Sequence, residues 1–235
     1  MSTNNTAAIR QLQTDLRNAG YYLGNIDGIW GTASEKAYNE FKDNYAKSTA
    51  VELPTTPAAA ADEIRWGAKV SVTFKERVIW IAKDLQIGPD PIEGASMLMD
   101  CMAFESGESF SPSVRNAAGS SAIGLIQFMS FTAKALGTTT EALGKMTAED
   151  QLNYVYKYFA PQKGKLKNLG DIYMAILWPK AVGKPDSFVL WDRNTAPTAY
   201  RQNSGLDSNK DGVVVRGEAV VKIMGKSARG AKFLG

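Results

Sequence analysis

Residues 91–105 read PIEGASMLMDCMAFE, and this pattern predicts a buried helix. Its apolar side chains recur at the spacing of one helix face, namely Ile92, Ala95, Met99 and Met102. Proline is favoured in the first turn of a helix, so Pro91 marks the expected start. The run ends at Glu105, which places a carboxyl group where an apolar helix meets a polar loop.

The sequence on either side of this segment is also mostly helical in pattern. Thr73 and Glu76 match a capping box at the start of another helix, which Gly88-Pro89 ends. Further helices are expected near residues 127–136, 148–159 (capped by Thr147) and 170–177. Val213–Val215 is the one good strand candidate. The predicted fold class is therefore mainly all-α.

The residue counts exclude several kinds of enzyme. The 235 residues include no histidine, which excludes Ser-His-Asp and Cys-His catalysis and zinc hydrolases that use histidine ligands. They include one cysteine, Cys101, which excludes an internal disulfide and a cysteine-cluster metal site. The net charge of +3 is too small to indicate a nucleic-acid partner. Carboxyl, lysine, tyrosine or hydroxyl groups must therefore carry any catalysis.

Three parts are expected along the chain. They are a small helical unit at residues 1–46, a linker at 47–62 and a larger helical unit at 63–235. The linker prediction rests on Pro54, Pro57 and a run of four alanines, because prolines break helices and the alanines offer little to pack.

The first unit carries a glycine-rich turn between two helical segments. Asp27 can bond nearby backbone amides there, and Gly28 permits a tight turn. The unit resembles the three-helix type of peptidoglycan-binding domain through Leu12-Gln13, Leu16, Gly20-Tyr21-Tyr22, Asp27-Gly28, Trp30-Gly31, Ala37 and Phe41. The resemblance implies that the wall-binding residues are Tyr21, Tyr22, Asp27 and Trp30. The alternative is that these aromatic side chains fill a very small core.

Glu105 is the candidate catalytic residue of the second unit. A carboxyl group beside buried apolar side chains has a raised pKa, which a general acid requires at neutral pH. The loop at residues 106–121 is rich in Gly, Ser and Asn and could fold over a substrate. The amide of Gln127 can both donate to and accept from the N-acetyl group of an amino sugar.

Two motifs around Glu105 resemble the lytic transglycosylase and goose-type lysozyme superfamily over about residues 70–205. They are Glu105-Ser106-Gly107, followed by Phe110, Pro112 and Gly119, and then Gly124-Leu125-Ile126-Gln127. The resemblance implies that Glu105 is the catalytic acid and that Ser106 supports the site. It also implies a saccharide cleft lined by Gly107, Gly124, Leu125, Ile126 and Gln127. The whole arrangement is similar to modular bacteriophage endolysins.

One family motif, Ala-Tyr-Asn-x-Gly, is absent in that form. The corresponding stretch is residues 173–183, in which Trp178 is a possible substitute and Tyr173 is expected in the core. Tyr200 could close the cleft from the other side. Trp178 and Tyr200 are therefore the remaining candidate substrate-binding residues.

The expected reaction is cleavage of the bond between N-acetylmuramic acid and N-acetylglucosamine in peptidoglycan. Lytic transglycosylation with 1,6-anhydro products is favoured, because it needs one catalytic carboxyl group whereas ordinary glycosidases need two. Asp100 is five residues before Glu105 and faces elsewhere on the helix, while Glu108 in the loop could position a water. A hydrolytic muramidase of the same fold and a non-catalytic peptidoglycan-binding virion protein are the alternatives.

A calcium-binding loop is the third candidate site. Residues 207–218 read DSNKDGVVVRGE and match the EF-hand pattern, with Asp207, Asn209, Asp211, Val213 and Glu218 as candidate ligands. The alternative is an ion-free turn that only resembles such a loop. Calcium would have a structural role, and the expected catalysis requires no cofactor.

The expected partner is peptidoglycan, bound by a monomer, with no nucleic acid and no stable insertion into a membrane. The N-terminal residues are polar and lack a secretion signal, and no run of apolar residues is long enough to span a bilayer. We therefore expect synthesis in a host cytoplasm and action on the cell wall during host lysis. Access would depend on a separate pore-forming protein.

Overall fold

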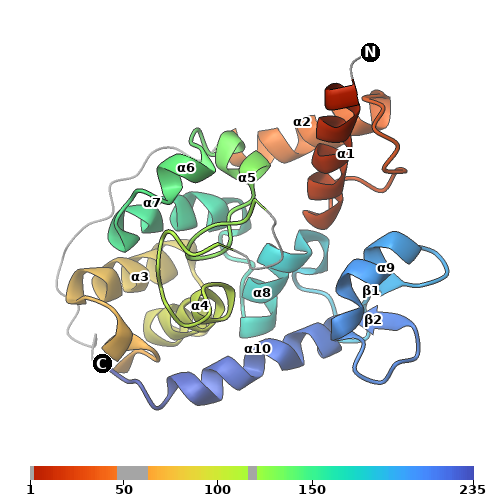
Figure 1. Ribbon diagram of the computed structural model, residues 1–235. Coiled ribbons are helices and arrows are strands. Elements are labelled where there is room, and N and C mark those ends of the chain that lie inside the picture. Colours follow the sequence, from red (N-terminus) through yellow and green to blue (C-terminus); the bar gives the residue numbers. More distant parts are fainter. Residues whose placement is uncertain (1–2, 47–62, 116–120) are drawn as a thin grey trace.

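The computed structural model describes residues 3–46, 63–115 and 121–235, and it confirms a predominantly helical fold (Figure 1). The α-helices are α1 (Thr3–Asn18), α2 (Thr32–Ala46), α3 (Val72–Leu85), α4 (Pro91–Glu105), α5 (Ser130–Ala135), α6 (Thr140–Leu143), α7 (Ala148–Phe159), α8 (Leu169–Leu177), α9 (Pro197–Asn203) and α10 (Arg216–Gly230). Short 3₁₀ turns are η2 (Gly67–Lys69), η3 (Ala160–Gln162), η4 (Pro179–Ala181) and η5 (Ser204–Leu206). The predicted linker, residues 47–62, lies outside the described residues.

Helix α4 is the centre of the larger unit and has the predicted bounds. Every side chain from Ala95 to Ala103 is buried, because α3, α8 and α10 all pack against this helix. Asp90 caps it by accepting hydrogen bonds from the amides of Ile92 and Glu93. The helix therefore delivers Glu105, at its last turn, to the edge of the core.

Two local predictions need correction. Helix α3 is capped by Ser71, whose Oγ accepts from the amide of Phe74, so the capping box predicted at Thr73 is wrong. Thr73 already lies inside the first turn, where its amide is one of those that need a cap. The helix predicted at 127–136 is shortened to α5, because Gln127 adopts a φ of 53° in a tight hairpin. The cap at Thr147 is confirmed, since it accepts from the amide of Asp150.

A two-stranded sheet lies beside α9 and α10. Strand β2 (Val213–Val215) was expected, and it pairs antiparallel with β1 (Val189–Asp192), which was not. Helix α10 follows β2 directly and runs along the lower edge of the molecule in Figure 1.

The N-terminal unit packs against the larger unit through aromatic side chains. Within residues 3–46 it has two helices, α1 and α2, rather than the three that the resemblance implies. The ring of Phe41 lies 4.6 Å from that of Phe131 on α5, and Tyr45 lies 5.5 Å from Tyr158 on α7. The two units therefore share one apolar interface.

Among the described residues, no helix has both the length and the apolar character needed to cross a membrane.

Candidate active site around Glu105

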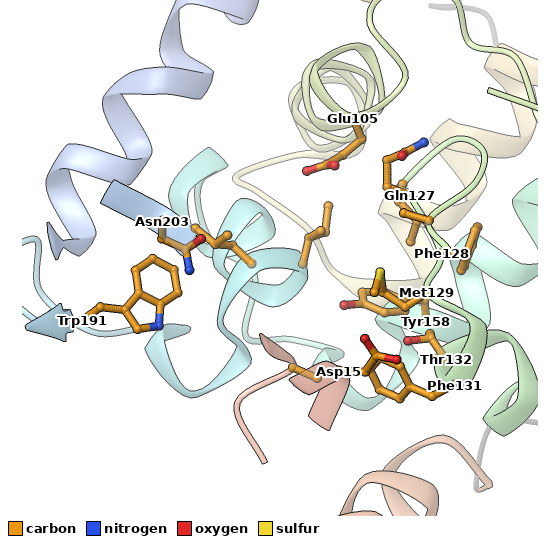
Figure 2. A pocket seen from close by; sticks show the side chains of 15 residues that line it. Asp15, Glu105, Gln127, Phe128, Met129, Phe131, Thr132, Tyr158, Trp191 and Asn203 are labelled. Atoms are coloured by element: carbon orange, nitrogen blue, oxygen red, sulfur yellow. The ribbon is translucent and has the colours of Figure 1, made fainter. Parts of the chain in front are cut away.

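Glu105 projects from the end of α4 into a pocket of about 290 Å³ (Figure 2). The walls come from α1, the segment 122–132, α7, α8, β1 and α9. Most of the lining side chains near Glu105 are apolar, including Ile126, Met129 and Leu177. The carboxyl group of Glu105 is therefore surrounded mainly by apolar side chains, which solvate a charge poorly.

Burial raises the pKa of Glu105 to about 8. The side chain is half-buried and reaches the pocket, so a ligand there can meet its carboxyl group. At neutral pH this carboxyl group carries its proton, which is the state that a general acid needs before it acts.

Ser106 fixes the loop that follows Glu105. It is buried, its Oγ accepts from the amide of Phe110 at 3.0 Å, and its carbonyl accepts from the Ser109 hydroxyl at 2.7 Å. Gly107 has a φ of 62°, which turns the chain back toward α4. Neither Ser106 nor Gly107 lines the pocket, so both act on its shape rather than on a ligand.

The predicted Gly124-Leu125-Ile126-Gln127 motif forms the hairpin beside Glu105. Ile123 and Phe128 exchange both backbone hydrogen bonds across it, at 3.1 and 2.8 Å. Ile126 and Gln127 line the pocket, whereas Leu125 is fully buried. The Nε2 of Gln127 donates to two backbone carbonyls, of Val114 and Gly124, so Oε1 is the atom left to interact with an amide N–H of a ligand.

Gln151 on α7 supports this hairpin and was not predicted. Its Oε1 accepts from the amide of Leu125 at 2.7 Å, and its Nε2 donates to the carbonyls of Pro112 and Leu143. A Cβ at Gly124 would lie 2.2 Å from the same Oε1, which explains why glycine is needed there. No local pattern marks Gln151, because its partners come from distant segments.

Trp178 and Tyr200 do not line the Glu105 pocket. Trp178 is buried edge-on against Trp191, with 5.4 Å between ring centroids, and it borders a neighbouring pocket instead. The Tyr200 hydroxyl donates to Oδ2 of Asp207 at 2.6 Å, which places it with the candidate calcium loop. The Glu105 pocket is lined instead by Trp191 on β1 and Asn203 on α9. Sequence reasoning missed both because it predicted neither β1 nor α9.

The other carboxyl groups near Glu105 in the sequence are engaged elsewhere. Asp100 is fully buried and accepts hydrogen bonds from Arg65 and from the indole N–H of Trp66, as its predicted orientation implies. Glu108 pairs with Lys226 at 2.5 Å and Arg229 at 2.8 Å, and these cations lower its pKa. Neither group lines the pocket.

An unpredicted carboxyl group, Asp15 of α1, does line the pocket. It is buried, and burial raises its pKa to about 6. Figure 2 shows it beside Phe131 and Thr132, on the opposite side of the pocket from Glu105. The N-terminal unit therefore supplies part of the wall of this site.

The predicted wall-binding residues divide into two kinds. Tyr22 is buried, Tyr21 packs edge-on against Phe41, and Asp27 accepts from Gln13 and from the Ile29 amide, so these three maintain the fold. Trp30 is half-buried, bonds the carboxyl group of Glu35, and lines two surface hollows. Of the four, Trp30 is the one that lines the surface hollows described here.

The candidate calcium loop at 207–218 is closed by side-chain hydrogen bonds to its own backbone. Oδ2 of Asp207 accepts from the amide of Gly212, while Asn209 and Asp211 each accept from the amide two residues later. Oδ1 of Asp207 is buried and has no hydrogen-bond partner.

The last candidate ligand of this loop, Glu218, is engaged by backbone amides of the loop itself. Both oxygens of Glu218 accept from backbone amides, including those of Ser208 and Val215. Among the described residues, no three His, Cys, Asp or Glu side chains gather as a metal site. The candidate calcium ligands Asp207, Asn209, Asp211 and Glu218 therefore all accept backbone hydrogen bonds within the loop.

Comparison with protein families finds no match to this chain, and comparison with curated proteins finds none either.

Proposed function

We propose that this protein cleaves the bond between N-acetylmuramic acid and N-acetylglucosamine in peptidoglycan. The observation that carries the proposal is the carboxyl group of Glu105 in a largely apolar pocket that a ligand can enter, where burial raises its pKa to about 8. In the sequence, Glu105 precedes the Ser106 loop and the Gly124–Gln127 hairpin, and this is the order that the resemblance to lytic transglycosylases implies. The biological role that fits is lysis of a bacterial host by a bacteriophage endolysin.

The chemistry proposed for Glu105 has two proton transfers. The acid first gives its proton to the glycosidic oxygen as the bond to C1 of the muramic acid breaks. The resulting carboxylate then accepts the proton of the muramic 6-hydroxyl, whose oxygen attacks C1 and closes a 1,6-anhydro ring. The substrate supplies the nucleophile, so one carboxyl group is enough.

Hydrolysis is the second candidate, and Asp15 is the observation that favours it. A glycosidase that uses water needs a second carboxyl group facing the same bond. Asp15 lines the pocket of Glu105 from the other side and, with a pKa of about 6, is mostly ionised at neutral pH. In this case the products would carry reducing ends, and Asp15→Asn would abolish the formation of these products.

Digestion of purified peptidoglycan tests the proposal. Mass spectrometry is expected to find 1,6-anhydro ends with the wild-type protein and no products with Glu105→Gln. Glu108→Gln is the matched control, because Glu108 is a neighbouring carboxyl group outside the pocket, and it should digest the wall normally. Equal digestion by wild type and Glu105→Gln would refute the assignment. Binding without digestion by the wild type would leave the non-catalytic virion protein as the better interpretation.

We also propose that the loop at 207–218 binds calcium as a structural ion. The support is the buried Oδ1 of Asp207, which lacks a partner that a cation would provide. Asn209, Asp211 and the Val213 carbonyl would complete the inner set, with Glu218 joining after it leaves the backbone amides. Strand β2 begins in this loop and pairs with β1, which carries Trp191. The ion would therefore stabilise the position of β1.

A further inference from the structure

Three hollows follow one another across the surface between Glu105 and Trp30. The Glu105 pocket shares Asp15 and Phe131 with a second hollow, here called the α1–α5 hollow. The α1–α5 hollow shares Trp30 with a third, here called the α2 hollow. The three hollows, linked by these shared wall residues, form a series from the larger unit to the N-terminal unit, here called the groove.

Helix α1 forms one side of the α1–α5 hollow, and its Asp15 also lines the Glu105 pocket. Ala8, Gln11, Leu12 and Asp15 line the α1–α5 hollow and are spaced as one helix face. The opposite side is α5, through Ser130, Phe131 and Lys134. Phe41 of α2 contacts Phe131, which packs the N-terminal unit against α5 beside this hollow.

The walls combine aromatic rings with hydrogen-bonding side chains. Trp30 and Tyr38 stand edge-to-face at 5.9 Å and both border the α1–α5 hollow. Polar groups accompany them, namely Gln11, Ser130 and Lys134 in the α1–α5 hollow and Thr32, Glu35, Lys36 and Asn39 in the α2 hollow. A sugar ring has an apolar C–H face and a polar rim, so a chain of sugars matches both kinds of wall.

We propose that a single glycan strand occupies the whole groove, with the cleaved bond at Glu105 and more distant sugars on Trp30 and Tyr38. The proposal rests on the proposed function, and it deepens it by naming a long strand as the preferred substrate. The N-terminal unit then supplies distant subsites of the catalytic cleft itself, in place of a separate anchor on the wall.

Strand length is the variable that tests this proposal. Glycan strands freed of stem peptides are separated into tetrasaccharides and strands of ten or more sugars, and kcat/KM is measured on each. Wild-type protein is expected to prefer the long strands by roughly tenfold, which corresponds to about 1.4 kcal/mol of additional binding. Trp30→Ala is expected to bring the ratio of long-strand to short-strand kcat/KM close to one.

Two further variants keep the result interpretable. Lys134→Ala alters an exposed side chain on α5, away from the N-terminal fold, and should also lower the ratio. Ile29→Ala is the matched control, since Ile29 is 68% exposed in the same turn as Trp30 but borders none of the three hollows, and it should keep the wild-type ratio.

The outcomes separate this proposal from the proposed function. Cleavage of both lengths with equal kcat/KM, or a wild-type ratio in both Trp30→Ala and Lys134→Ala, would overturn the groove while leaving the glycosidase in place. Failure of the wild type to cleave strands of either length would overturn the glycosidase and the groove with it.

Discussion

Replacing Glu105 with glutamine should stabilise the protein while it removes activity. The reason is that the pKa of Glu105 is about 8 in the folded chain, against 4.5 for an ordinary glutamate. Between these two pH values the Glu105 carboxyl group is ionised in the unfolded chain and protonated in the folded chain. The free energy of unfolding of the wild type therefore falls as the pH rises. Glutamine does not titrate and therefore escapes this loss.

The magnitude follows from the distance between the two pKa values. Each pH unit above 4.5 costs the wild type up to about 1.4 kcal/mol of unfolding free energy until the folded carboxyl group ionises. Water reaches the half-buried side chain through the pocket, which reduces the effect. We therefore expect Glu105→Gln to be more stable by about 2–3 kcal/mol at pH 7, equivalent to roughly 5–10 °C in melting temperature. At pH 4 the two proteins should be equal.

Urea unfolding of both proteins from pH 4 to pH 8 measures this difference. Glu108→Gln is the control of opposite sign, because Lys226 and Arg229 lower the pKa of Glu108. That variant should be less stable than the wild type by up to about 1 kcal/mol at pH 7, with the difference vanishing as acid protonates Glu108. A gain in Glu105→Gln that is the same at pH 4 and pH 7 would refute the raised pKa, and with it the basis for general-acid catalysis.

Three further outcomes are expected. The kcat/KM of the wild type should fall tenfold per unit above about pH 8, as Glu105 loses its proton; a pH profile that stays flat to pH 10 would contradict this role. Gly124→Ala should lose about 2–4 kcal/mol in urea unfolding, because its φ is 80° and the new Cβ would meet Gln151, whereas Gly183→Ala, with a similar φ and open space, should lose only about 1 kcal/mol. Calcium at a hundred times its Kd should stabilise the wild type by about 2.7 kcal/mol and leave Asp207→Ala unchanged; the absence of any calcium effect on wild-type melting would rule out the site.

The parts of the fold that the sequence could predict are those encoded in local patterns. The helix at 91–105 was predicted with its observed bounds, because its start carries Pro91 and its apolar face repeats along its whole length. Strand β2 was recognisable from three successive valines. Strand β1 was not, because its four residues, Val-Leu-Trp-Asp, form a strand only when β2 lies alongside them.

The candidate site divides in the same way. Glu105, Ile126 and Gln127 were predicted from continuous motifs, and all three line one pocket. Asp15 and Trp191 line it too, but they are 90 residues before and 86 residues after Glu105, and no local pattern connects them. The structure brings them in through helix packing and strand pairing, which are interactions between segments far apart in the chain.

The aromatic contact between the two units affects how this protein could be divided or recombined. A cut in residues 47–62 that removed the N-terminal unit would expose the rings of Phe131 and Tyr158 to water. It would also remove Asp15 and Ala19 from the wall beside Glu105. A unit transplanted from another protein would need matching rings at the positions of Phe41 and Tyr45 to restore that wall. The chain is therefore poorly suited to exchange of its parts as independent cassettes.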